Sequence, residues 1–187
     1  MKKIIVSIFI TACFSSISNA QFSFKGGINL ANQSYNTNIA TGPIETSSIL
    51  GYLVGINYKA NLGLVSIRPG IEFSTKGANL TSSASANSSF GYIELPVDFV
   101  YSIGNVSVFS GPYMAFLLSA KNGEFDLKED MKTLDAGLNI GLDFKIGNFG
   151  IGAKYGLGIS DISEIVVNSI DISIKNNVLS LYLTYTL

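Results

Sequence analysis

The sequence predicts an all-β fold, an eight-stranded antiparallel up-and-down barrel that crosses a membrane. Three observations lead to this prediction. Eight segments alternate apolar and polar side chains with the period of two that is typical of strands. The charged side chains in these segments all fall on the face opposite the apolar one. The connections alternate between two-residue turns and long polar stretches, which is how single-chain outer-membrane barrels are built.

The first four predicted strands span residues 22–32, 51–62, 65–76 and 92–103. Each is close to the length that a tilted strand needs to cross a bilayer. Their apolar faces include, in turn, Phe24 and Ile28, Val54 and Ile56, Ile67 and Ile71, and Leu95 and Phe99. Their opposite faces carry Lys25, then Lys59, then Arg68, Glu72 and Lys76, then Glu94 and Asp98.

The other four predicted strands span residues 106–118, 134–146, 149–159 and 178–187. The first of these has no charge, so its apolar face is indicated only by apolar residues: Val108, Met114, Phe116 and Leu118. In the other three, the apolar faces include Leu138 and Leu142, Ile151 and Tyr155, and Leu181 and Leu183. The residues opposite them include Asp135, Asp143 and Lys145, then Lys154, then Ser180 and Thr184.

Tight turns are predicted at Gly63-Leu64, Gly104-Asn105 and Gly147-Asn148, because glycine and asparagine accept the positive φ that two-residue hairpins require. The other connections, residues 33–49, 77–91, 119–133 and 160–177, are long and polar. We expect them to form four loops at the opposite rim, on the outside of the cell, with both chain ends on the periplasmic side.

Three prolines argue against a regular ladder, because proline cannot donate a backbone hydrogen bond. They are Pro69, Pro96 and Pro112. In the register set by the Gly104-Asn105 turn, Pro96 faces Tyr113 and Pro112 faces Val97. We therefore expect one shared bulge or kink to absorb both.

Composition excludes several classes of function. Charged residues make up 13% of the 187 residues and apolar residues 47%, the net charge is −1, and the mean hydropathy is +0.38. A basic surface for nucleic acid is therefore not expected. The chain has no histidine, which excludes imidazole metal sites and Ser-His-Asp or Cys-His catalysis. We predict a protein that is not an enzyme and has no cofactor.

The first 20 residues have the features of an export signal. Lys2 and Lys3 precede an apolar run over residues 4–14, and Ser18-Asn19-Ala20 is a small-residue cleavage site. The prediction is a signal peptide over residues 1–20 and one barrel domain over residues 21–187. In an alternative interpretation, Ile10-Thr11-Ala12-Cys13 is a lipoprotein cleavage box and Cys13 is acylated.

The same alternation also fits a soluble, lipocalin-like carrier with an apolar lumen. Two features favour the opposite orientation. Many glycines share the charged face, where strands crowd around a narrow lumen. Aromatic residues of the apolar face gather near the short-turn ends, as in an interfacial girdle: Phe22, Tyr58, Tyr101, Phe144, Phe149 and Tyr185.

We expect the inward charges to form a closed network around Arg68, the only arginine. Turn registers place Asp98 opposite Gly111, Glu94 opposite Ala115, Lys154 opposite Gly141, and Lys59 opposite Arg68. The predicted members of this interior polar network are Arg68, Glu72, Glu94, Asp98, Asp135 and Lys154. Its favoured role is structural, because side chains fill eight-stranded barrels. A proton or small-ion path is the alternative.

Two further motifs are weak. The glycine-rich residues 150–156 have the wrong spacing for a phosphate loop and lie within a predicted strand. Glu124, Asp126, Glu129 and Asp130 could gather calcium, but lysines are interleaved with them and no ligand pattern is matched. A solvated loop is the favoured interpretation.

Five motifs together resemble the small outer-membrane β-barrel domain family that includes the PorT-like proteins. They are Phe24-Lys25-Gly26-Gly27-Ile28-Asn29-Leu30-Ala31, Tyr92-Ile93-Glu94-Leu95-Pro96, Gly111-Pro112-Tyr113, Asp135-Ala136-Gly137 and Lys154-Tyr155-Gly156-Leu157. The resemblance covers essentially the whole chain after residue 20. It implies an outer-membrane location, and PorT-like members are associated with protein secretion.

Three functions follow as expectations. The first is a non-enzymatic outer-membrane barrel that stabilises the envelope or binds a partner through its four long loops. The second is a PorT-like accessory of secretion, and the third is the soluble carrier of an apolar ligand. Expected partners are outer-membrane lipid, the barrel-assembly machinery and a protein at the extracellular loops, and nucleic acid is not expected.

Overall fold

The computed structural model describes residues 21–37, 46–80, 87–123, 125–163, 166–167 and 170–187. The predicted signal peptide, including Cys13, lies outside these residues. So do Glu124 and parts of three predicted loops, residues 38–45, 81–86, 164–165 and 168–169.

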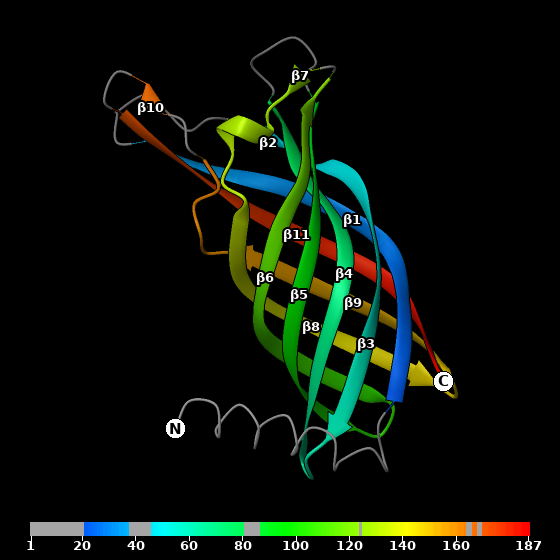
Figure 1. Cartoon of the computed structure of the whole chain (residues 1–187). Helices are drawn as coiled ribbons and strands as arrows, with labels where there is room; N and C mark the ends of the chain where they lie inside the picture. The colour runs from blue at the N-terminus through cyan, green and yellow to red at the C-terminus, as the bar shows by residue number, and fades with distance from the viewer. Residues whose placement is uncertain (1–20, 38–45, 81–86, 124, 164–165, 168–169) are drawn as a thin grey trace, which may run out of the picture.

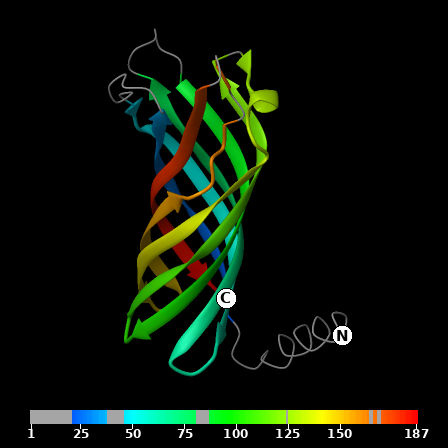
Figure 2. The same cartoon turned by 90° about the vertical axis from the view of Figure 1, so that its left-hand side faces the viewer.

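Eight long strands form one closed antiparallel barrel (Figures 1 and 2). They are β1 (Gln21–Thr37), β3 (Ile49–Asn61), β4 (Val65–Leu80), β5 (Asn87–Ile103), β6 (Val106–Asn122), β8 (Leu134–Ile146), β9 (Phe149–Gly158) and β11 (Ile170–Thr186). Each pairs with the next in this order, and β11 pairs with β1 to close the barrel. The predicted fold class is confirmed.

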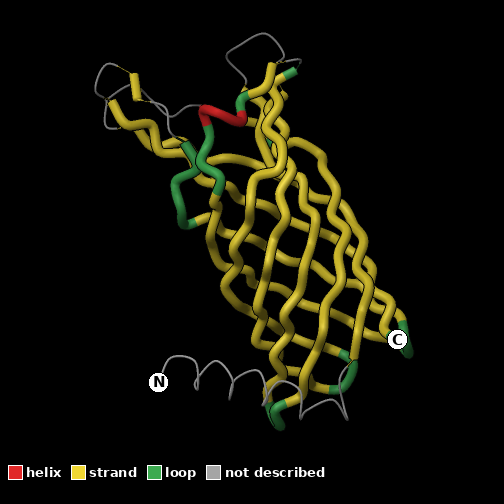
Figure 3. Tube along the Cα trace, in the orientation of Figure 1, coloured by secondary structure: helices red, strands yellow, loops and turns green. Residues whose placement is uncertain are grey.

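Short elements gather at one end of the barrel (Figure 1). They are β2 (Thr46–Ser47), β7 (Phe125–Asp126), β10 (Val166–Val167) and the 3-10 turn η2 (Lys128–Asp130). We name this end the long-loop rim. The other end, the short-turn rim, holds the C-terminus and the tight turns, drawn in green in Figure 3.

The tight turns follow the prediction. Gly63, Gly104 and Gly147 have φ values of 96°, 58° and 59°, the left-handed region that glycine adopts without a steric penalty. The amide of Leu62 donates to the carbonyl of Val65 at 2.9 Å across the first turn. These turns set the registers as expected, with Glu94 opposite Ala115 and Lys154 opposite Gly141.

Several strands extend further toward the long-loop rim than predicted. β1 continues to Thr37, β4 to Leu80 and β6 to Asn122, while β5 begins at Asn87 and β11 at Ile170. The predicted boundaries of the four loops were wrong by several residues there. Period two is read from apolar residues, and the extensions of β1, β4 and β6 contain few of them. The extension of β11 does alternate, with Ile170, Ile172 and Ile174, and was nevertheless assigned to a loop.

The prediction was a bulge or a kink shared by two prolines, and the register has no bulge at them. The pairing of Pro96 with Tyr113 and of Phe99 with Ser110 keeps a single register, and the shift between β5 and β6 lies instead at Gly91/Tyr92. A Cβ at Gly111 would collide with the carbonyl oxygen of Val97. The two strands therefore approach closely beside the prolines, which glycine permits without a change of register.

The barrel has an apolar exterior and a polar interior, as predicted. On the outer face Ile140 is 58% exposed and Leu183 65%, whereas the inward Asp135 is fully buried. Two aromatic pairs, Phe22 with Tyr58 and Phe149 with Tyr185, lie near the short-turn rim with ring centroids 5.1 Å apart. A soluble carrier with an apolar lumen would need the opposite orientation. No helix among the described residues is long and apolar enough to span a membrane.

Candidate functional site

Side chains fill the lumen in three successive layers. An apolar cluster occupies the end near the long-loop rim, ion pairs occupy the middle, and a cluster around Arg68 lies nearer the short-turn rim. The apolar cluster includes Phe90, Tyr92 and Tyr113, together with Met131 and Ile162 from the connections beyond β6 and β9. These connections therefore contribute buried side chains to this end of the lumen.

The middle layer is a chain in which cations and anions alternate. We name it the central ion-pair chain, and its members in order are Lys25, Glu72, Lys154, Glu94, Lys76 and Asp135. Glu72 accepts hydrogen bonds from the first two lysines of the chain. Lys25 Nζ lies 2.6 Å from Glu72 Oε1, and Lys154 Nζ lies 2.7 Å from Glu72 Oε2.

Glu94 continues the chain in the same way. Its Oε1 lies 3.1 Å from Lys154 Nζ and its Oε2 lies 3.1 Å from Lys76 Nζ. Lys76 Nζ also contacts Asp135 Oδ2 at 3.0 Å, and it lies 4.3 Å from the centre of the Tyr113 ring. The side chain of Asn176 donates to Asp135 at 3.0 Å. Each lysine therefore contacts one or two carboxylates, and the chain ends against the apolar cluster.

Strand geometry brings these six side chains together from different walls of the barrel. Glu72 and Lys76 are four residues apart on β4 and so point to the same side. β4 and β9 are four strands apart in the closed order of eight, which places Glu72 and Lys154 on opposite walls. Their contact therefore crosses the lumen and ties the two walls together.

The arginine cluster lies beside the central chain. Arg68 donates from Nη2 to Asp98 Oδ2 at 2.9 Å and from Nη1 to Asp143 Oδ2 at 2.6 Å. Tyr182 donates to the other oxygen of Asp143 at 2.7 Å, and the guanidinium lies 4.3 Å from the centre of the Phe109 ring. The guanidinium thus contacts one aromatic ring and two carboxylates, which suits arginine better than lysine.

The six residues predicted from the sequence are divided between two groups. Glu72, Glu94, Asp135 and Lys154 belong to the central ion-pair chain, whereas Arg68 and Asp98 belong to the arginine cluster. Within the described residues, the carboxylates that pair with Arg68 are Asp98 and Asp143.

Four members of the two groups were not among the predicted set: Lys25, Lys76, Asp143 and Tyr182. The three charged ones were recognised as inward-facing. Hairpin registers fix neighbours on adjacent strands but not contacts across the lumen, so no signal in the sequence assigned their partners.

The central ion-pair chain is electrically balanced and tightly packed. Three lysines face three carboxylates, with every side chain of the chain at most 6% exposed. The cavity beside Lys76, Glu94 and Lys154 has a volume of only about 10 Å³. One water needs about 10–15 Å³ in this measure, so the layer has room for at most one. The geometry therefore blocks the lumen.

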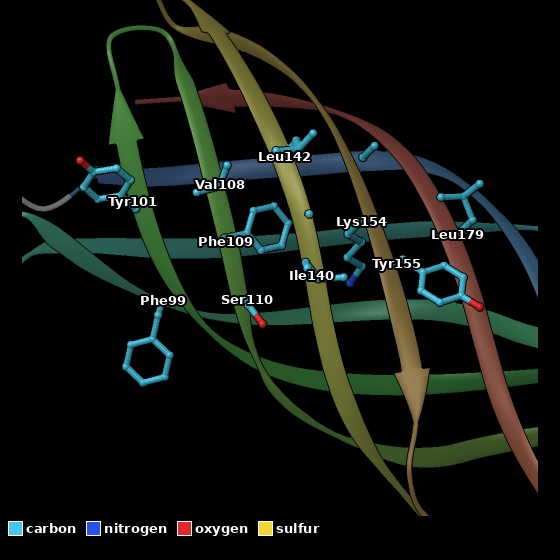
Figure 4. Close-up of a pocket in the computed structure, with 12 residues that line it drawn as sticks. Phe99, Tyr101, Val108, Phe109, Ser110, Ile140, Leu142, Lys154, Tyr155 and Leu179 are labelled. Carbon is cyan, nitrogen blue, oxygen red and sulfur yellow. The ribbon is translucent and has the colours of Figure 1, made fainter.

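A large hollow lies along the outer surface of the barrel (Figure 4). It is an apolar groove of about 670 Å³ across β5, β6, β8, β9 and β11. Small side chains such as Ser110 and Ala153 lie between large ones such as Phe99 and Tyr155. Most of its lining belongs to the apolar exterior, and it is also bordered by Lys154 of the central ion-pair chain and by Phe109, which packs on Arg68.

The two weak motifs gain no support from the structure. Residues 150–156 lie within β9, where extended backbone cannot form a phosphate loop. In the part of the chain that the structure describes, no group of three or more acidic or cysteine side chains could hold a metal ion. Glu124 lies outside that part.

Comparison with known proteins places this geometry in a family. The chain superposes on Neisserial surface protein A with a TM-score of 0.59 and 12% identity, covering 91% of this chain and 100% of that one. It superposes on the outer membrane protein OprG of Pseudomonas aeruginosa with a TM-score of 0.51 and 10% identity, covering 90% of this chain and 96% of that one.

No curated protein sequence matches the chain. Residues 14–164 match the family described as the outer membrane protein beta-barrel domain. The chain therefore belongs to the outer membrane protein β-barrel domain family and lies in the outer membrane of a Gram-negative bacterium.

Proposed function

We propose that this protein is a non-enzymatic, closed outer-membrane barrel that acts through its long-loop rim, either by binding a partner or by stabilising the envelope. The observation that carries the proposal is the central ion-pair chain, which crosses the lumen and leaves no room for a solute. An eight-stranded barrel has space only for its own side chains, and here those side chains are locked by paired charges. If solutes do not pass through the barrel, its function depends on what its surfaces contact.

The long-loop rim is the surface best suited to that role. In single-chain outer-membrane barrels the short turns face the periplasm and the long loops face outward. Here several strands continue beyond the predicted apolar band, so they lift the loops away from the lipid surface. A PorT-like role in secretion rests on the sequence resemblance alone and stays a prediction, as do assembly by the barrel-assembly machinery and removal of residues 1–20 as a signal peptide.

Conductance tests the closed lumen. We expect the purified protein to give no stable current steps in planar lipid bilayers, because the central layer has room for at most one water. A variant with Glu94→Ala and Lys154→Ala, which removes one charge of each sign and widens that layer, is expected to show small steps. Heat-dependent gel mobility serves as the control that both proteins are folded. Stable ohmic steps in the unmodified protein would contradict the proposal.

Protease access tests which rim faces outward. Lys128 is exposed in η2 at the long-loop rim, and we expect trypsin added to intact cells to cleave after it. Lys25 and Lys76 are buried in the lumen and are expected to resist even after lysis. Lys128→Gln is the matched control and should remove that cleavage product. Cleavage at Lys128 only after the outer membrane is broken would reverse the assigned orientation.

A further inference from the structure

A small polar cavity opens at the short-turn rim, on the far side of the arginine cluster from the central ion-pair chain. Its volume is about 60 Å³, several times the roughly 10–15 Å³ that one water needs. Its lining includes Lys59, Lys145, Arg68, Asp143 and the hydroxyl-bearing Thr184. We name this cavity the periplasmic mouth, because short turns face the periplasm in this family of barrels.

Two lysines of the periplasmic mouth have neutral partners. Lys59 Nζ donates to Ser102 Oγ at 3.1 Å, and Lys145 Nζ donates to Gln21 Oε1 at 3.2 Å. Within the part of the chain that the structure describes, neither lysine takes part in an ion pair. They differ in this respect from the three lysines of the central chain, all of which contact carboxylates.

Among the described residues, the ion-paired groups of the lumen together with Lys59 and Lys145 sum to one excess positive charge, which lies at this mouth. The central ion-pair chain is neutral by itself, with three cations and three anions. The arginine cluster has one cation, Arg68, and two anions, Asp98 and Asp143. Adding Lys59 and Lys145 gives three cations and two anions around the mouth. One negative charge from outside the chain would balance it.

Asp143 is the one carboxylate in the lining of the mouth, and its oxygens are already bonded. Oδ2 accepts from Arg68 and Oδ1 accepts from Tyr182. Both oxygens of Asp143 therefore accept from donors other than the two lysines. Hydroxyl groups of Ser107 and Thr184 also line the mouth, and hydroxyls donate readily to oxyanions.

We propose that the periplasmic mouth binds one small oxyanion of the phosphate or carboxylate class, held by Lys59 and Lys145. Ammonium groups make short, charge-assisted hydrogen bonds to such oxygens, and these bonds are about twice as strong as neutral ones. The ligand replaces Ser102 and Gln21 as the lysine partners and balances the excess charge. This site is independent of the proposed role of the long-loop rim, since it lies at the opposite end of the barrel.

Titration with inorganic phosphate tests the site in the full-length folded protein. Amide signals of Gly150 and Thr184 are followed by NMR in zwitterionic micelles, at constant ionic strength maintained with chloride. We expect saturable shifts at these residues. The variant with Lys59→Gln and Lys145→Gln should bind at least tenfold more weakly, whereas the variant with both lysines replaced by arginine should retain binding. A control variant with Lys121→Gln and Lys128→Gln, at the other rim, should match the unmodified protein.

The source of the oxyanion is distinguished by a second arm. The same signals are compared in nanodiscs of zwitterionic lipid and in nanodiscs that contain phosphatidylglycerol, without added phosphate. Shifts that appear with the anionic lipid alone identify a lipid headgroup as the ligand, and shifts that appear with free phosphate alone identify a soluble anion. The proposal would be overturned if the shifts rise linearly with phosphate without saturating and the anionic lipid causes none. It would also be overturned if the shifts persist unchanged in the variant with Lys59→Gln and Lys145→Gln.

Discussion

Replacing Glu72 by leucine is expected to lower the free energy of unfolding of the barrel by about 3–5 kcal/mol, the range measured when one partner of a buried pair is removed. Glu72 contacts two buried lysines, Lys25 at 2.6 Å and Lys154 at 2.7 Å. The variant leaves Lys25 without a carboxylate, while Lys154 keeps Glu94. Urea unfolding in lipid vesicles, read by the difference in gel mobility between folded and unfolded protein, measures the change.

Two matched variants separate charge from packing in that experiment. Glu129→Leu removes an exposed acid in η2 and is expected to change stability by less than about 0.5 kcal/mol. Glu72→Leu combined with Lys25→Met removes one charge of each sign and should recover part of the loss, because Lys154 retains Glu94. If the single and double variants are equally unstable, then lost packing and not the unpaired lysine is the cause.

Placing arginine on the outer face is expected to cost an amount that depends on depth. Ile140 is the middle residue of β8 and is 58% exposed on the apolar exterior. Ile140→Arg should therefore destabilise the barrel by about 2–4 kcal/mol, the cost of arginine at the centre of a bilayer. Urea unfolding in vesicles is again the measurement.

The depth control is Ile103→Arg. Ile103 is the last residue of β5, directly before the turn at the short-turn rim, and is 69% exposed. Near the interface the cost of arginine falls to about 0–1 kcal/mol, so this variant should be close to the unmodified protein. Equal losses at the two positions would show that Ile140 is not in the hydrocarbon core.

Local sequence signals were sufficient to predict the barrel wall. In strands such as residues 134–146 the alternation of Leu138 and Ile140 with Asn139 and Gly141 determines which face contacts lipid. Turns at Gly104 and Gly147 then fix the register of each hairpin, because a two-residue loop allows only one pairing. Both kinds of signal lie within a few residues along the chain.

The partners within the lumen could not be predicted in the same way. Arg68 was expected at the centre of one network, but its acid Asp143 is 75 residues away in the sequence and comes from β8. Such contacts depend on the tilt and stagger of the closed barrel, which bring non-adjacent strands together. The extensions of β1 and β6 were missed for a different reason, since they contain almost none of the apolar residues from which a strand is recognised.

The closing pair of strands has a consequence for biogenesis. β1 and β11 are the first and last strands of the described chain, and they hydrogen-bond to each other from Ser23 with Thr186 to Thr37 with Ile172. Until β11 is in place, both β1 and β9 present a row of unpaired backbone groups, which hydrocarbon does not tolerate. A chain in which β11 has not yet paired with β1 and β9 is therefore not expected to be stable within the bilayer. Insertion is therefore expected to wait for the last strand of the barrel.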